Sequence, residues 1–336
     1  LSVADIRAYQ PRKGDALCRP FRVYTVCTAP PPSSGVALLQ GLMMLERTDI
    51  ADRSPADPVA WVRLAEVERL MYADRDRYVG DEPSAGTPVE GLLAPDYVAA
   101  RAALVGDRAG PAPKPGVPAG AGIRAPDRTL EPAGTSHFVI VDRWGNTVSM
   151  TTTVEAVFGS GRMVGGFFLN NQLTDFSFSP TEADGVPAAN AVAPGKRPRS
   201  SMAPLIVLDR DGNLVAALGS PGGSAILSYN LKAMVGVFDW ELSLQDAFDL
   251  PNLVARGDRF SSEAARYPEG VVDALKARGI TFSPGGENSG LHGAAHQPGV
   301  PRTRHDARGG GSIFSRGAQR FVRRRSRRQG RACIRL

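Results

Sequence analysis

The chain has 336 residues, of which 42% are hydrophobic and 22% are charged, and its formal net charge is +6. These values are ordinary for a globular protein and argue against a fibrous or wholly disordered chain. No run of 18 apolar residues occurs, and the opening LSVADIRAYQ has no basic-then-apolar leader. We therefore expect a fragment of a globular protein, with no membrane span and no signal peptide in this chain.

The positive charge is concentrated at the C-terminal end. Residues 301–336 carry twelve Arg, no Lys and one Asp, hence +11, so the remaining chain carries −5 (6 minus 11). A run such as RRRSRR could bind nucleic acid or an anionic membrane by releasing counterions. Because this segment has no apolar period and uses Arg exclusively, we expect residues 297–336 to be a disordered or out-of-frame tail. Nucleic-acid binding by that tail is a weaker alternative.

Residues 1 to about 108 are predicted to be mainly helical. After PPPSSG at 30–35, an apolar run predicts a helix over 35–46, with Ser33 or Ser34 as its N-cap. In the next helical segment, DPVAWVRLAEVERLMYADRDRYVGD, the Arg residues near the end favour a helix C-terminus. Its apolar face is formed by Ala60, Leu64, Val67 and Met71.

The cysteines and histidines do not have the spacing of metal ligands. Cys18 and Cys27 could form a disulfide in an oxidising compartment, or they could remain free thiols, and Cys333 is far away in the chain. The four histidines form no cluster in the sequence. We expect no metal site.

A Pro/Gly/Ala-rich segment, 109–134, is predicted to be an exposed linker, and sheet character begins directly after it. FVIVDRWGNTVSM at 138–150 and LIVLDRDGNLVAAL at 205–218 each place two apolar arms around an Asp-to-Asn turn, which predicts two hairpins. The run at 224–239 predicts a helix. This order favours an α+β architecture, in which helices cover antiparallel sheets.

Thr135 stands where the linker meets the first predicted strand, with Gly134 before it. A threonine hydroxyl needs a base before it can act as a nucleophile, and the base can be the threonine's own α-amino group, whose reference pKa is about 7.7–8.0. That chemistry requires cleavage of the Gly134–Thr135 bond. A flexible linker is a suitable place for such a cut.

Four ordered motifs follow: TSHFVIVDRWGNTVSMTTTVEAVFGSG, GFFLNNQLTDFS, GKRPRSSMAP and GSPGGSAI. Together they resemble the small subunit of the γ-glutamyltranspeptidase family, within the N-terminal nucleophile hydrolase superfamily. Upstream, DIRAYQP, PPPSSG and YADRDRYVGD resemble the C-terminal half of that family's large subunit. The resemblance covers residues 1 to about 293 and implies an αββα sandwich. It divides the chain into a large-subunit part (1–134), a small subunit (135–296) and the tail (297–336).

The resemblance implies roles for the catalytic residues. Thr135 matches the nucleophile, freed by self-cleavage after Gly134, and Thr153 matches a threonine whose hydroxyl bonds to it. Gly222 and Gly223 match the oxyanion-hole pair, whose backbone N–H groups would face the developing negative charge. Without the resemblance, Thr153 would be an ordinary strand residue and PGG an ordinary turn.

The resemblance also implies a pocket for a γ-glutamyl group, which carries an ammonium and a carboxylate on one carbon. Asp175 matches the acid that holds the ammonium, with Gln172 beside it. Ser200 and Ser201 match hydroxyl donors to the α-carboxylate. A turn residue and a helix-capping pair are the structural alternatives. Glu155 replaces an Asn of well-known members and adds an acid near the amino-group site.

The implied activity is hydrolysis or transfer of a γ-glutamyl group, for example from glutathione, to water or to an amino acid or peptide. No aromatic residue lies between Phe178 and Arg199, where strong transferases often carry a tyrosine-bearing lid, so we expect an open site that favours water. A glutaryl or cephalosporin-type acylase is the alternative. The family's carboxylate-binding arginine lies upstream of this chain, so an inactive fragment is also considered. No cofactor is expected, and family members are commonly periplasmic or secreted.

Overall fold

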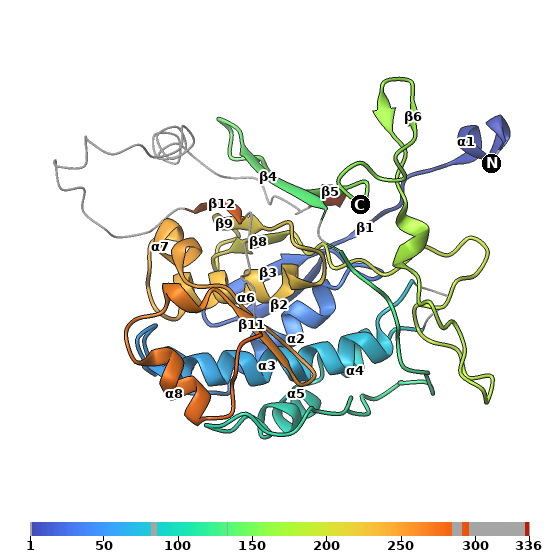
Figure 1. Cartoon of the computed structure of the whole chain (residues 1–336). Coiled ribbons are helices and arrows are strands. Elements are labelled where there is room, and N and C mark those ends of the chain that lie inside the picture. The colour runs from blue at the N-terminus through green and yellow to red at the C-terminus, as the bar shows by residue number, and fades with distance from the viewer. Residues whose placement is uncertain (1, 82–85, 133, 284–290, 296–332, 336) are drawn as a thin grey trace.

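The computed structural model describes residues 2–81, 86–132, 134–283, 291–295 and 333–335. Its centre is a five-stranded antiparallel sheet in the order β12-β9-β8-β3-β2 (Figure 1). The strands are β2 (Leu17–Phe21), β3 (Tyr24–Thr28), β8 (Leu205–Leu208), β9 (Leu214–Gly219) and β12 (His292–Ala295). Because β3 pairs with β8, segments from before and after residue 134 share one sheet.

The pairing of β2 with β3 also decides the state of two cysteines. Cys18 lies directly opposite Cys27 in the register of these strands, and the two form a disulfide. Of the two alternatives that the sequence left open, the structure therefore has the paired one.

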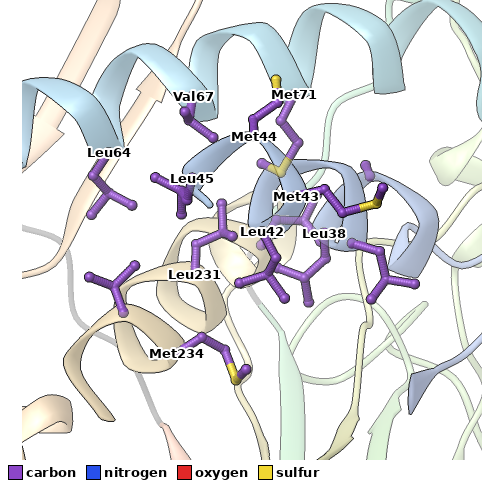
Figure 2. Close-up of a cluster of buried hydrophobic side chains, with 14 of the residues drawn as sticks. Leu38, Leu42, Met43, Met44, Leu45, Leu64, Val67, Met71, Leu231 and Met234 are labelled. Carbon is purple, nitrogen blue, oxygen red and sulfur yellow. The ribbon is translucent and has the colours of Figure 1, made fainter. Parts of the chain in front are cut away.

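One face of the sheet is covered by helices α2 (Gly35–Leu45) and α6 (Ile226–Phe238), and α3 (Pro58–Tyr78) packs on these two helices. Figure 2 shows their leucine and methionine side chains meeting in one apolar core. The predicted apolar face of α3 is confirmed, because its four residues are all buried. Every residue of α2 is buried too, and its single polar side chain, Gln40, donates to Asp74 Oδ2 at 2.8 Å.

The predicted N-cap position of α2 is confirmed, but not a capping hydrogen bond. Ser34 occupies the N-cap position, but its side chain makes no capping hydrogen bond. Its hydroxyl instead donates to the Ser200 carbonyl at 2.7 Å and accepts from Arg75 Nε at 2.8 Å. A long-range contact has replaced the local one, and it ties the start of α2 to the segment around Ser200.

The first predicted hairpin is confirmed as β4 (Thr135–Val141) and β5 (Thr147–Thr153), with its turn at Asp142–Asn146. This hairpin lies on the face of the central sheet away from α2 and α3 (Figure 1), where Ser149 Oγ donates to the Leu218 carbonyl of β9 at 3.3 Å. The outward side chains Phe138, Ile140, Val148 and Met150 are exposed. The described residues thus form a helical layer and two β layers, and they do not establish the second helical layer of an αββα sandwich.

The remaining elements are shorter. Helices are α1 (Val3–Ala8), α4 (Val89–Leu92), α5 (Pro95–Ala102), α7 (Leu244–Asp249) and α8 (Val271–Ala277). Strand pairs are β1 (Lys13–Asp15) with β13 (Cys333–Arg335), β6 (Met163–Val164) with β7 (Phe167–Phe168), and β10 (Leu253–Arg256) with β11 (Arg259–Ser262). Single 3₁₀ turns are Ile50–Asp52, Gln172–Asp175, Gly223–Ala225 and Ala264–Arg266. None of the helices in the described part of the chain has the length and hydropathy to cross a bilayer.

The segment predicted as an exposed linker is more firmly held than its composition suggested. Within 109–132 the Gly116 N–H donates to Asp74 Oδ1 at 2.8 Å, and its carbonyl accepts from Tyr78 Oη at 2.6 Å. Ala125 and Thr129 are buried. The segment has no helix or strand, but buried polar side chains of the helical layer bind its backbone and lead it to Thr135.

Candidate active site

Thr135 and Thr153 face each other across the hairpin. Thr135 is the first residue of β4, Thr153 is the last of β5, and the antiparallel register pairs them directly. The five-residue turn and the equal arms fix this pairing, since a slip by one residue would turn every side chain of the strand to the opposite face. Two hydroxyls separated by 18 residues in sequence are thereby placed at the same end of one hairpin.

The Thr153 hydroxyl is aimed at the peptide bond before Thr135. Its Oγ1 donates to the Gly134 carbonyl oxygen at 3.2 Å and accepts from the Glu155 N–H at 2.8 Å. Because the Glu155 N–H uses one lone pair of this oxygen, the hydroxyl proton is free to polarise the Gly134 carbonyl. That carbonyl carbon is the one that a nucleophilic Thr135 would attack.

Gly134 is required by close packing. A Cβ atom at this position would lie 1.7 Å from the Glu155 carbonyl oxygen, so no side chain fits without moving the backbone. Glu155 itself has a positive φ of 76°, which is uncommon for a residue with a side chain. The junction is thus a tight backbone crossing. Ala133, the residue before it, lies outside the described residues.

The two predicted oxyanion-hole glycines start the turn that leads into α6. Gly222 has φ 137° and Gly223 has φ 55°, both in the range that favours glycine. A Cβ on Gly223 would come within 2.4 Å of the Glu131 carbonyl oxygen and 2.6 Å of that of Pro132. The chain just before the Gly134–Thr135 bond therefore lies against this loop.

A pocket opens beside Thr135, and it brings together most of the residues singled out from the sequence. Of those residues, only Gly134 and Gly222 are not part of its lining. The lining consists of Glu131, Pro132, Thr135, Thr153, Glu155, Gln172, Asp175, Arg199, Ser200, Ser201, Met202, Gly223 and Ile226.

His137 is near Thr135 in sequence but not in this pocket. Its ring packs against Gly219 of β9, and its Nδ1 is 2.8 Å from Thr151 Oγ1. Burial, with a smaller contribution from the charge of His292, lowers the pKa of His137 to about 4. His137 is therefore neutral near pH 7 and packs against the central sheet, so it is not placed to act as a base for Thr135.

Two buried acids, Glu155 and Asp175, line the pocket. Glu155 and Asp175 are hydrogen-bonded to each other, and burial followed by the neighbouring charge of Glu155 raises the pKa of Asp175 to about 8. Burial raises the pKa of Glu155 as well. Near pH 7 Asp175 is therefore largely protonated, so the pair carries less negative charge than two free carboxylates, which suits a single ammonium group.

The raised pKa gives a prediction for stability. A folded-state pKa above the unfolded value means that the stability contribution is present below about pH 4 and is lost as the pH rises towards 8. We expect Asp175→Asn, made in an uncleavable Thr135→Ala background, to be more stable than that background at pH 8, by on the order of 1–3 kcal/mol. The difference should shrink towards pH 4. Urea unfolding at several pH values measures it.

The exposed acid Asp184 provides the control, since Asp184→Asn should change stability little at any pH. A stability difference for Asp175→Asn that stays constant between pH 4 and pH 8 would contradict the raised pKa of Asp175.

Sequence reasoning missed three charged residues of this site. Arg75 and Arg199 are fully buried beside the pocket, and both bind the carboxylate of Glu131. Arg75 had been interpreted as part of a helix C-terminus, and Glu131 as part of the exposed linker. Only one sequence feature could have indicated these residues. Arg199 directly precedes Ser200 and Ser201, and an arginine beside two hydroxyls is compatible with an anion site.

No group of three or more His, Cys, Asp or Glu side chains among the described residues is arranged to hold a metal ion. The polar groups that line the pocket are hydroxyls, carboxyls, the Arg199 guanidinium, the Gln172 carboxamide and backbone groups.

Comparison with known proteins adds three findings. A family profile described as "Gamma-glutamyltranspeptidase" matches residues 1–315. The chain is 38% identical to the "Glutathione hydrolase proenzyme" of Bacillus subtilis over 282 residues, which are 80% of this chain and 45% of that protein. It is 33% identical to the "Acylase ACY 1 proenzyme" of Pseudomonas sp. over 279 residues, 82% of this chain and 47% of that protein.

Among solved structures, the cephalosporin acylase from Bacillus halodurans superposes with a TM-score of 0.72 and 24% identity, over 84% of this chain and 48% of that one. This likeness concerns the fold alone. The chain spans about half the length of these relatives.

Proposed function

The chain belongs to the gamma-glutamyltranspeptidase family of N-terminal nucleophile hydrolases, and from that premise we propose that it cuts itself before Thr135 and then cleaves γ-glutamyl amides such as glutathione. The observation that carries the proposal is the position of the Thr153 hydroxyl, which is opposite Thr135 in the register and 3.2 Å from the Gly134 carbonyl oxygen.

Self-cleavage would proceed as an N-to-O acyl shift followed by hydrolysis. The Thr135 oxygen adds to the Gly134 carbonyl carbon and gives up its proton, while the Thr153 hydroxyl stabilises the developing oxyanion. The C–N bond then breaks, the nitrogen takes up a proton, and Gly134 remains as an ester on Thr135. Water opens this ester, which leaves a Gly134 carboxylate and a Thr135 with a free hydroxyl and a free α-amino group.

Turnover would repeat this chemistry on a substrate. The free α-amino group accepts the Thr135 hydroxyl proton as the oxygen attacks the γ-carbonyl carbon, and it returns the proton to the leaving amine. Gly222 and Gly223 are the candidates for stabilising the oxyanion through their backbone N–H groups, and Gly223 lines the pocket beside Thr135. Water, an amino acid or a peptide then takes the acyl group from the ester.

The two ends of a γ-glutamyl group would bind different residues of the pocket lining. The Glu155–Asp175 pair, whose negative charge is reduced by the raised pKa of Asp175, suits the ammonium, and Gln172 lies beside it in the lining. Ser200 and Ser201 are the candidate donors to the carboxylate.

The two products of cleavage are expected to remain associated. β2 and β3 come from before Thr135, whereas β8, β9 and β12 come from after it, and all five share one sheet. α2 and α6, from the two sides of the cut, also pack together. Separation would expose this core, so the subunits should co-purify.

The disulfide between Cys18 and Cys27 supports an oxidising, exported location such as the periplasm or the medium. The Arg-rich tail is the segment for which the sequence indicated nucleic-acid binding as an alternative. Most of it lies outside the described residues.

A pair of assays tests the proposal against the acylase alternative. That alternative is supported by the 33% identity to the Pseudomonas acylase proenzyme. We expect kcat/KM for γ-glutamyl p-nitroanilide to exceed that for glutaryl p-nitroanilide by about 100-fold. Glutaryl lacks the ammonium, and leaving a buried charge without its partner costs about 2–5 kcal/mol. Equal rates, or a preference for the glutaryl compound, would favour the acylase function. Loss of both activities in Thr135→Ala assigns them to this site.

A further inference from the structure

A buried carboxylate of the linker occupies the basic end of the pocket. Glu131 Oε1 accepts from Arg75 Nη2 at 2.7 Å and from Arg199 Nη2 at 3.0 Å, and Glu131 Oε2 accepts from Ser201 Oγ at 3.1 Å. Both guanidinium side chains have 0% exposure, and the Glu131 side chain has 7%. The ion pairs of Glu131 are therefore shielded from solvent, whereas exposed ion pairs are weakened by water and salt.

The surrounding charges make the cluster a strong carboxylate site. Burial alone would raise the pKa of Glu131, but the Arg75 and Arg199 charges outweigh it and hold that pKa well below its ordinary value. Asp127 and Asp76 also pair with Arg199. Even so, Arg199 Nη1 is buried with no hydrogen-bond partner among the described residues, so the guanidinium retains unused donor capacity.

Glu131 precedes Thr135 by four residues, and it lines the same pocket. Ser201, which binds its side chain, is one of the two candidate donors to a substrate carboxylate. The backbone of Glu131 and Pro132 also packs against Gly223. In the uncut chain, the segment before the cleavage bond is therefore held at both its side chain and its backbone.

We propose that Glu131 is a built-in stand-in for a substrate carboxylate. In the uncut chain it fills a site formed by Arg75, Arg199 and Ser201, and it thereby holds the Gly134 carbonyl against the Thr153 hydroxyl. Glu131 is a positioning residue for cleavage. After the cut, withdrawal of the segment that ends at Gly134 empties the site for a carboxylate-bearing acyl donor. This last step rests on the function proposed above, whereas the carboxylate site does not.

The site is tested first in uncut protein. In a Thr135→Ala background, Glu131→Ala removes the stand-in, and we expect glutarate to bind at least 10-fold more tightly than it binds to Thr135→Ala alone, by isothermal titration calorimetry. Glutaramide, which has the same length but no charge, should not gain affinity. Glu90→Ala is the matched control, since Glu90 also pairs with an arginine, Arg19, but is 84% exposed.

Removal of Glu131 leaves buried positive charge without its partner, so the variant can lose its fold. In that case glutarate is expected to restore a cooperative thermal transition, because a ligand that binds only the folded state stabilises it. Glutarate affinity equal to that of the background, or an unfolded variant that glutarate does not rescue, overturns the carboxylate site.

The positioning role is tested with Thr135 intact. Glu131→Gln keeps the size of the side chain and should slow self-cleavage at least 10-fold. Glutarate should not restore cleavage of Glu131→Ala, because free glutarate fills the site without being joined to the segment before Thr135. Rescue of cleavage by glutarate would instead assign Glu131 to charge balance and stability and would overturn the positioning role. Unchanged cleavage in Glu131→Gln overturns that role. A parent chain that never cuts refutes the proposed function, and the binding experiment still decides the carboxylate site.

Discussion

Thr135→Ala is expected to purify as a single uncut chain, whereas the parent sequence yields two chains that end at Gly134 and begin at Thr135. The substitution removes the oxygen that attacks the Gly134 carbonyl in the proposed reaction, so the loss of cleavage should be complete. Thr135 is only partly buried at the start of β4, and the fold should tolerate alanine there. Denaturing gel electrophoresis and intact mass measure the outcome.

Thr135→Ser provides the matched control. It keeps a hydroxyl on the same Cβ and should still cut, although more slowly because the serine side chain is freer to rotate. A Thr135→Ala protein that is cut at the same bond would show that an external protease or another residue performs the cleavage.

Thr153→Val is expected to slow self-cleavage by about 10²–10³-fold, the cost of removing one oxyanion donor. Valine has nearly the same shape and suits a strand, but it cannot donate to the Gly134 carbonyl or accept from the Glu155 N–H. Loss of these bonds should cost only about 1–3 kcal/mol of stability. The rate is followed as the decay of the uncut chain at a fixed temperature.

Thr153→Ser keeps both hydrogen bonds and should cut at a rate close to that of the parent chain. If Thr153→Val cuts as fast as the parent while its circular dichroism shows the same fold, the Thr153 hydroxyl does not take part in the reaction. A slow Thr153→Val with an intact fold locates the effect at the Gly134 carbonyl.

Local sequence patterns predicted the elements that carry the site. The apolar arms and the Asp142–Asn146 turn predicted the first hairpin, and its symmetry about the turn also determines that Thr135 lies opposite Thr153. The helix over 224–239 was predicted from its apolar run and is α6. These features follow from short-range periodicity and turn chemistry, which the sequence records directly.

The charged cluster could not be predicted in this way. Glu131 is 56 residues from Arg75 and 68 residues from Arg199, so their pairing depends on how the linker crosses the helical layer. Locally, the same residues are typical of a helix end and a polar linker. The disulfide was left open for a related reason, because the register of β2 with β3 determines whether Cys18 meets Cys27.

The raised pKa of Asp175 also could not be predicted from the sequence, because it depends on burial and on the nearby Glu155. The sequence showed two acids that lie 20 residues apart. The resemblance assigned Asp175 to an ammonium site, and Glu155 was a departure from the family pattern near that site. Only their joint burial raises the pKa of Asp175 to about 8 and reduces the charge of the pair. The same change in charge decides how strongly the pocket should distinguish a γ-glutamyl from a glutaryl group.

The most direct test of the central claim is N-terminal sequencing of the purified parent protein. We expect two N-termini, one of which begins Thr-Ser-His-Phe at Thr135 and is absent from Thr135→Ala. A well-folded parent protein that keeps one intact chain, or that is cut at another bond, would contradict it.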